Sequence, residues 1–136
     1  RNQFGAIIVS MLQGPVNDEI GLLIHDQLRL TASITHESGR GLQLEIGAKV
    51  FVLIKASAVE ITPAATASRL GTNQFGGVVD VLIRGELRSE AQILVDQHLR
   101  LVVTLDNSLL DELKLEQLMR VHCRVDPSSV ILAVAA

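Results

Sequence analysis

The stretch ITHESGRGLQLEIGAKVFVLIKAS, residues 34–57, decides the fold. Thr35 or Ser38 can cap one or two helical turns, and the glycine-rich segment 37–44 is too short for a long helix. The run 50–54 that follows is apolar on both faces, which is typical of a central or interface strand. The stretch therefore predicts a strand, a short helix and a second strand, after which a single lysine follows.

Further strands lie on both sides of this stretch. Phe4–Leu12 is an apolar run that ends at a Gly-Pro pair, and Glu19–Ile24 is a second strand that forms a hairpin with it. Leu28–Ile34 alternates apolar and polar residues with the period of two of a half-buried strand. Val59–Thr62 makes a fifth strand. Five short strands with a helix between the third and fourth match an OB-like barrel.

The same plan occurs twice, at an offset of 71 residues without a gap. Asn2–Gly5 (NQFG) recurs as Asn73–Gly76, and a small, polar segment with Pro63 at its start separates the copies. The sequence predicts an all-β chain of two tandem OB-like five-stranded barrels, each with one short helix. The predicted divisions are repeat 1 at 1–62, a linker at 63–72 and repeat 2 at 73–136.

Composition narrows the classes of function. The 136 residues carry a net charge of -3, and their lysines and arginines are scattered, so direct nucleic-acid binding by this chain is disfavoured. With three Phe and no Trp or Tyr, a base-stacking surface has few candidate residues. The apolar runs are shorter than the roughly 18 residues of a membrane-spanning helix, so no membrane segment is expected.

Cys123 is the single cysteine and lies in an apolar, alternating pattern that indicates a buried strand face. One cysteine excludes an intrachain disulfide and a cysteine-rich zinc site. No signal peptide is recognisable, so we expect a cytoplasmic protein. The chain begins with Arg rather than Met, and we expect it to be part of something longer.

The two copies differ at a few polar positions. The 71-residue offset pairs Arg1 with Thr72, Thr35 with Asp106, Ser38 with Leu109, and Lys55 with Asp126. The first copy therefore offers two cations and two hydroxyls, whereas the second offers two carboxylates, a hydroxyl and a leucine.

This difference points to an anion site in the first copy. Asp caps a helix at least as well as Thr, so stability alone does not explain Thr35. A helix start lined by hydroxyls attracts an anion, and a carboxylate in the same place repels it. Arginine and lysine suit tetrahedral oxyanions, so Lys55 is interpreted as a contact for a dianion. The alternative is that Lys55 only reaches water and that Thr35 and Ser38 only cap a helix.

The motifs RNQF, ITHESGRGLQLEIG and VFVLIKASAVEIT resemble the molybdate-binding Mop (TOBE) repeat. That repeat reads Ser-Ala-Arg-Asn, then Thr-x-x-Ser, then Lys-Ala before a closing valine strand. The resemblance covers both copies and is greatest to the tandem Mop region of ModE-type molybdate-responsive transcription regulators. The motif's serine would precede residue 1, and Ala6 stands where the family usually has Gly.

The resemblance implies a homodimer that holds molybdate or tungstate, without an organic cofactor, at the subunit interface. It implies that Arg1 reaches in from one subunit, while Thr35, Ser38, Lys55 and the backbone of Ala56 come from the other. The second copy keeps none of the four polar ligands, and we expect it to be structural.

The function implied is that of an oxyanion-sensing effector domain, in which the ligand favours one arrangement of the dimer. DNA contact would occur only through an N-terminal domain absent from this segment. Two other functions stay open: a cytoplasmic storage protein of the molbindin type, and an accessory domain of a molybdate-transporter ATPase. The loss of ligands in the second copy argues against the storage protein.

Catalysis finds little support in the sequence, and neither a catalytic residue nor a metal ligand is predicted. The four histidines have no metal-ligand spacing, and no Ser-His-acid triad is indicated. His36 lies between the proposed ligands, yet a solvent-facing loop histidine is the favoured interpretation. Asp106 and Asp126 are interpreted as unpaired surface acids rather than as a cation site.

Overall fold

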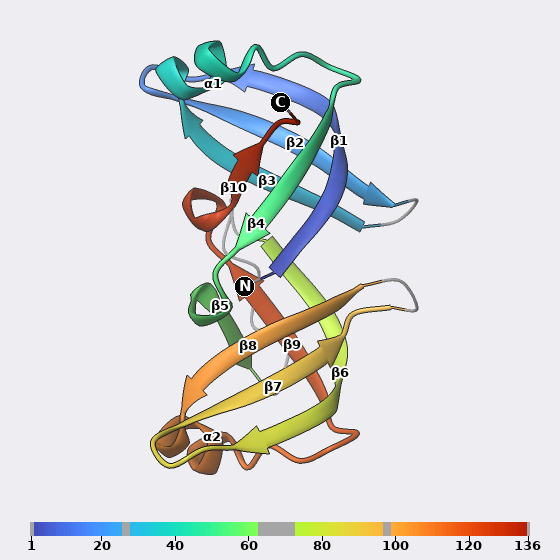
Figure 1. Cartoon of the computed structure of the whole chain (residues 1–136), viewed down its shortest axis with the longest axis vertical. Coiled ribbons are helices and arrows are strands. Elements are labelled where there is room, and N and C mark those ends of the chain that lie inside the picture. The colour runs from blue at the N-terminus through green and yellow to red at the C-terminus, as the bar shows by residue number, and fades with distance from the viewer. Residues whose placement is uncertain (1, 26–27, 63–72, 97–98, 136) are drawn as a thin grey trace. The chain divides into compact units, whose positions relative to one another are not determined.

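The computed structural model of the chain describes residues 2–25, 28–62, 73–96 and 99–135 (Figure 1). Arg1 and the predicted linker 63–72 lie outside the described residues. The chain divides into two compact units, each built on one curled five-stranded sheet. We call them the first barrel, which holds Asn2–Ile54 and the chain from Asp126 onward, and the second barrel, which holds the described parts of Lys55–Val125.

The first barrel has the strand order β10-β4-β1-β2-β3, with every neighbouring pair antiparallel. Its elements are β1 (Asn2–Gln13), β2 (Asn17–His25), β3 (Leu28–Thr35), α1 (His36–Leu42), β4 (Lys49–Ile54), the 3-10 turn η2 (Pro127–Ser129) and β10 (Ile131–Ala133). The five strands and the helix that the sequence predicts for repeat 1 are present, and β4 is an inner strand as its apolar run indicates.

The second barrel has the order β5-β9-β6-β7-β8 and is also antiparallel throughout. Its elements are the 3-10 turn η1 (Ala56–Ala58), β5 (Val59–Thr62), β6 (Asn73–Arg84), β7 (Arg88–Leu94), β8 (Arg100–Asp106), α2 (Asn107–Leu113) and β9 (Arg120–Val125). The prediction of an all-β chain of two OB-like barrels with one short helix each is confirmed.

Each barrel takes one strand from the other sequence repeat, as Figure 1 shows for β10 beside β4 and β5 beside β9. Ile131 of β10 lies opposite Leu53, and Val59 of β5 lies opposite Val125. The chain passes to the second barrel after Ile54 and returns to the first after Val125. The compact units therefore cross the repeat boundaries read from the sequence.

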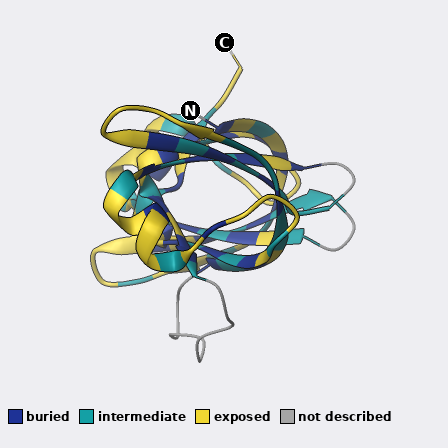
Figure 2. Cartoon of the chain, turned by 90° about the horizontal axis from the view of Figure 1, so that it is seen from below, coloured by how far each residue is buried: buried dark blue, intermediate teal, exposed yellow. Residues whose placement is uncertain are grey.

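The two cores are built from equivalent positions. Alternation along the strands turns one face inward, whereas the helical turns are largely exposed (Figure 2). Completely buried side chains of the first barrel include Ile8, Ile20, Leu22, Val52 and Ile54. Their partners at the 71-residue offset, Val79, Ala91, Ile93, Cys123 and Val125, are completely buried as well. The repeat thus preserves the core.

Both sheets bend at the same place. The pairing of β1 with β2 shifts between Ile8 and Ser10, and the pairing of β6 with β7 shifts between Val79 and Val81, which are the equivalent positions. Such bulges increase the local twist of a strand and help a sheet to curl.

The exchanged strands give a stability test. Leu132 of β10 is 8% exposed and pairs with Val52. Leu132→Ala should lower the free energy of unfolding by about 2–3 kcal/mol, because a buried leucine is lost. Amide hydrogen exchange should speed up in β4 more than in β9. The matched control is Ile61→Ala, the equivalent position on β5. In that variant, hydrogen exchange should speed up in β9 more than in β4. Faster exchange of β9 in the Leu132 variant would contradict the observed pairing.

Burial also controls the reactivity of Cys123, which is a free thiol in the core of the second barrel. Desolvation raises the pKa of the Cys123 thiol to about 12, so the thiolate is scarce at pH 8. A thiol reagent at pH 8 should leave the folded chain unmodified and should modify it once denaturant is added. Equal reaction rates with and without denaturant would show that the thiol is accessible.

Candidate functional site

Thr35 and Ser38 form a hydroxyl pair at the start of α1. Thr35 ends β3 and is the N-cap of the helix, where its Oγ1 accepts a hydrogen bond from the Ser38 backbone N–H at 3.2 Å. The Thr35 hydroxyl also donates to Ser38 Oγ at 2.9 Å. Both residues are exposed, and the capping role predicted for Thr35 is confirmed.

The hydroxyl pair borders a pocket of about 430 Å³ in the first barrel. Polar residues on its wall are Ser33, Thr35, Ser38 and Ser128, and the remainder is mainly apolar residues of β3, α1 and β10. Ser128 belongs to η2, which comes from the second sequence repeat and packs against β3. The strand exchange therefore brings residues of the second repeat to the side of the first repeat's hydroxyl pair.

Lys55 follows β4 directly and is exposed at the start of η1. Its carbonyl accepts a hydrogen bond from the Ala58 N–H at 2.9 Å, and no described residue forms an ion pair with its ammonium group. Ala56, the next residue, is buried. The turn packs against β8 in the second barrel. The side chain of Lys55 is therefore accessible to an anion.

The predicted site residues divide between the barrels. Thr35 and Ser38 belong to the first barrel and touch each other, whereas Lys55 and Ala56 belong to the second. Arg1 is outside the described residues. The structure thus brings the two hydroxyls together and assigns the lysine to the other compact unit.

The two aspartates that replace Lys55 and Thr35 in the second repeat lie on the opposite barrels from the residues they replace. Asp126, which replaces Lys55, belongs to the first barrel, and Asp106, which replaces Thr35, belongs to the second. Asp126 accepts hydrogen bonds from the Ser128 N–H at 2.9 Å and from Ser128 Oγ at 2.7 Å, and these bonds lower the pKa of the Asp126 carboxyl. Asp106 makes no side-chain capping bond and lies 3.8 Å from Arg88. It is therefore not the unpaired acid expected from the sequence.

The interpretation of His36 as a solvent-facing loop residue is wrong. His36 is the first residue of α1, and its Nδ1 lies 2.5 Å from Oδ1 of the buried Asp18. The sequence held a signal for this contact: Asp18 alternates with Ile20 and Leu22, so it shares their inward face. A carboxylate on a buried face requires a polar partner.

No group of three His, Cys, Asp or Glu side chains in residues 2–25, 28–62, 73–96 and 99–135 is arranged to hold a metal ion. Across those same ranges no helix has the length and apolar character needed to cross a membrane. Of the predicted contacts, the described residues present two hydroxyls on the first barrel and, separately, an accessible ammonium group on the second.

Together these features define a class of protein: a chain of two tandem OB-like barrels in which each sheet takes a strand from the other repeat. Residues 1–61 match the TOBE domain, so the first repeat belongs to the TOBE domain family. The resemblance of the chain to a tandem Mop (TOBE) region is thereby confirmed, since its relatives and structural neighbour are of this kind.

Three similar proteins illustrate the relationship. The molybdenum transport protein ModE of Herbaspirillum seropedicae is 32% identical over 85% of this chain and 43% of the relative, and the transcriptional regulator ModE of Yersinia pestis is 31% identical over 98% and 51%. The chain spans about half the length of these relatives, or less. The crystal structure of the cytoplasmic molybdate-binding protein ModG with molybdate bound superimposes with a TM-score of 0.92 at 27% identity, covering 99% of this chain and 96% of that one. All three are named for transport, regulation or binding rather than for catalysis.

The N-cap positions provide a matched pair of substitutions. Thr35→Ala removes a capping hydrogen bond and should lower the free energy of unfolding by about 1 kcal/mol, whereas Asp106→Ala, where no such bond exists, should change it little. Chemical denaturation of both variants measures the difference. Equal losses would mean that the Thr35 bond does not stabilise α1.

Proposed function

We propose that this chain is the oxyanion-binding effector region of a molybdate-responsive transcription regulator. Molybdate or tungstate is the ligand, and Arg1, Thr35, Ser38, Lys55 and the backbone of Ala56 are its proposed contacts. The second repeat supplies no polar ligand and completes the barrels through the exchanged strands. The chain works in the cytoplasm as a homodimer.

The observation that carries the proposal is the similarity to molybdate-bound ModG along nearly the whole length of both chains. The ModE relatives support the regulatory role, because their matched halves align with almost all of this chain. One of them, from Escherichia coli, is described as a DNA-binding regulator. We assign DNA binding to the other half of such a regulator.

The residue chemistry agrees with a tetrahedral dianion as ligand. The hydroxyls of Thr35 and Ser38 are exposed donors fixed on one helical turn, and Lys55 has no described ionic partner to neutralise it. Hydrogen bonds from charged donors to an oxyanion are among the stronger ones in proteins. Since α1 has only seven residues, these side chains rather than the helix dipole would account for most of the binding.

The division of the ligands between compact units bears on the dimer. Thr35 and Ser38 belong to one unit and Lys55 with Ala56 to the other. In a homodimer the two groups can be supplied by different subunits, so a shared oxyanion need not receive all its contacts from one chain. Oxyanion binding would then favour the arrangement of subunits that completes the contacts, through its differential affinity for that arrangement.

A storage or homeostasis protein is the second candidate function. ModG supports it, because this chain matches 96% of the length of that cytoplasmic molybdate-binding protein. The carboxylates Asp106 and Asp126 in the second repeat argue for the regulator, since they remove half of the sites that a storage protein would use. A count of molybdate ions bound per chain separates the two functions.

Replacing Lys55 by the second repeat's residue tests the site. Lys55→Asp should weaken molybdate binding roughly tenfold to a hundredfold, because a charge-assisted hydrogen bond contributes about 1.5–3 kcal/mol. Isothermal titration calorimetry with molybdate, tungstate and sulfate measures the change. Lys49→Asp is the matched control, since it makes the same charge change at another exposed lysine and should leave the affinity close to that of the parent. Unchanged molybdate affinity in the Lys55 variant would contradict the proposed site.

A further inference from the structure

Asp18 is a carboxylate buried beneath the start of α1. It lies on β2 directly opposite Ile34 of β3, and its side chain is 8% exposed. Gly39 of α1 covers it closely: a Cβ at this position would lie 3.5 Å from Asp18 Oδ2 and 3.3 Å from Ile34 Cδ1. The first turn of the helix therefore rests on this carboxylate.

His36 provides the polar partner of this carboxylate. Its Nδ1 is 2.5 Å from Asp18 Oδ1 in a contact of ion-pair type, and that oxygen accepts no hydrogen bond from the described residues. Because His36 stands between Thr35 and Ser38 in the chain, the contact ties the segment that carries both hydroxyls to β2.

Ligand binding would disturb the existing bonds of the hydroxyl pair. The Thr35 hydroxyl donates its proton to Ser38 Oγ, so it must turn away from Ser38 before it can donate to an oxyanion. The bond from the Ser38 N–H to Thr35 Oγ1 can persist through this change. A tether that does not depend on the Thr35 proton would keep the turn in place while the proton changes its acceptor.

We propose that the Asp18–His36 contact positions the Thr35 and Ser38 hydroxyls for the oxyanion, an inference that rests on the proposed function. Asp18 and His36 are positioning residues, because they act through the two hydroxyls. Holding donors in their binding orientation lowers the ordering cost of binding.

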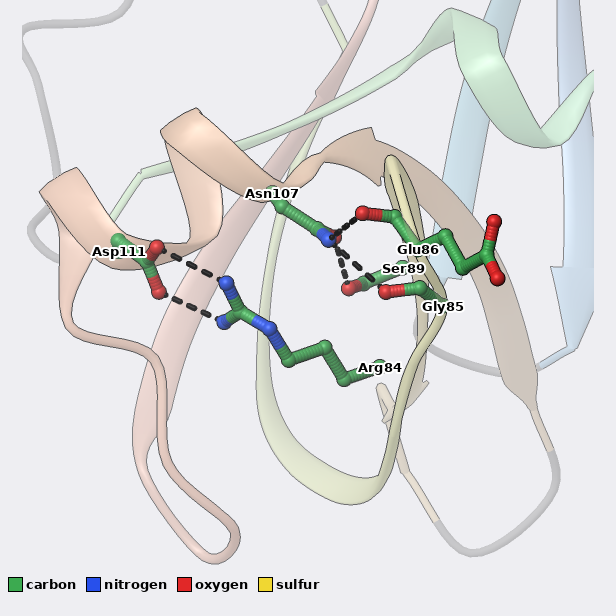
Figure 3. Close-up of polar contacts among 6 residues, drawn as sticks. All are labelled: Arg84, Gly85, Glu86, Ser89, Asn107 and Asp111. Carbon is green, nitrogen blue, oxygen red and sulfur yellow. Dashed lines mark hydrogen bonds and ion pairs between the residues drawn. The ribbon is translucent and has the colours of Figure 1, made fainter.

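The second barrel holds the equivalent helical turn with a different pair of residues. At the 71-residue offset, Ser89 replaces Asp18 and Asn107 replaces His36. Ser89 Oγ donates to Asn107 Oδ1 at 2.5 Å, and Asn107 Nδ2 donates to the carbonyls of Gly85 and Glu86 at 2.9 and 3.1 Å (Figure 3). A neutral pair therefore fastens the equivalent helix where no oxyanion ligands are present.

The second helix also has an anchor that the first one lacks. Arg84 donates two hydrogen bonds, of 2.7 and 3.0 Å, to the Asp111 carboxylate of α2 (Figure 3). The equivalent residues of the first barrel are Gln13 and Arg40, which cannot form an ion pair with each other. Among the described residues, Asp18–His36 is thus the one ion-pair-type contact that ties α1 to a strand.

The test compares molybdate affinity in variants of the two barrels. His36→Ala should weaken molybdate binding about tenfold, measured by calorimetry at a temperature well below unfolding, because the hydroxyls must then be ordered by the ligand. Asn107→Ala, the matched control, removes the equivalent contact of the second barrel and should lower the unfolding temperature without changing the affinity. The double variant Asp18→Ser with His36→Asn installs the second barrel's pair and should restore affinity to within about twofold of the parent.

Each result decides between the possibilities. If His36→Ala binds molybdate as tightly as the parent chain, the positioning role is overturned, while the proposed function stands. Equal weakening by Asn107→Ala would assign the effect to general destabilisation and also overturn it, as would a double variant that binds no better than His36→Ala. A parent chain that binds no molybdate would overturn the proposed function and this inference together.

Discussion

The structure depends on one feature of its pairing: neither sequence repeat completes its own sheet. The last strand of each repeat pairs in the sheet of the other, β10 on β4 and β5 on β9. A barrel of some 60 residues buries proportionally little apolar surface, so an incomplete one is a poor independent folding unit. Exchanging the final strands makes the folding of each core depend on both repeats. This agrees with the completely buried positions that the two repeats share, such as Val52 and Cys123.

The exchange also rearranges the polar groups that follow the central strands. Lys55 and Asp126 occupy equivalent places, one residue after β4 and after β9, at the points where the chain leaves one barrel for the other. Each residue therefore joins the barrel opposite to that of its own repeat's helix. Thr35 shares a barrel with Asp126, and Lys55 shares one with Asp106. The chemistry of either barrel cannot be derived from one repeat alone.

Much of this could be predicted from the sequence, because local patterns determined it. Alternation in Leu28–Ile34, the cap at Thr35 and the apolar run after Lys49 specified strands, helix and inner strand correctly. The strand exchange could not be predicted in the same way, since Val59–Thr62 satisfies the same pairing pattern whether it closes its own sheet or the equivalent one. The Asp18–His36 contact was missed because the predicted second strand began at Glu19. In the structure β2 begins two residues earlier, at Asn17, so Asp18 is part of the strand and lies on its buried face.

The two helix starts show why stability alone does not explain the polar residues of the first repeat. Asp and Thr are both good N-caps, yet Asp106 makes no capping bond, and α2 is held by Asn107 and by Arg84 with Asp111 instead. A neutral pair at the first helical turn, with an ion pair further along the helix, therefore suffices for this fold. The first repeat nevertheless buries a carboxylate, which is costly without a polar partner, and supplies that partner from a histidine between two exposed hydroxyls. In both barrels a polar pair thus holds the first turn of the helix to the neighbouring strand, and in the first barrel that turn carries the two exposed hydroxyls.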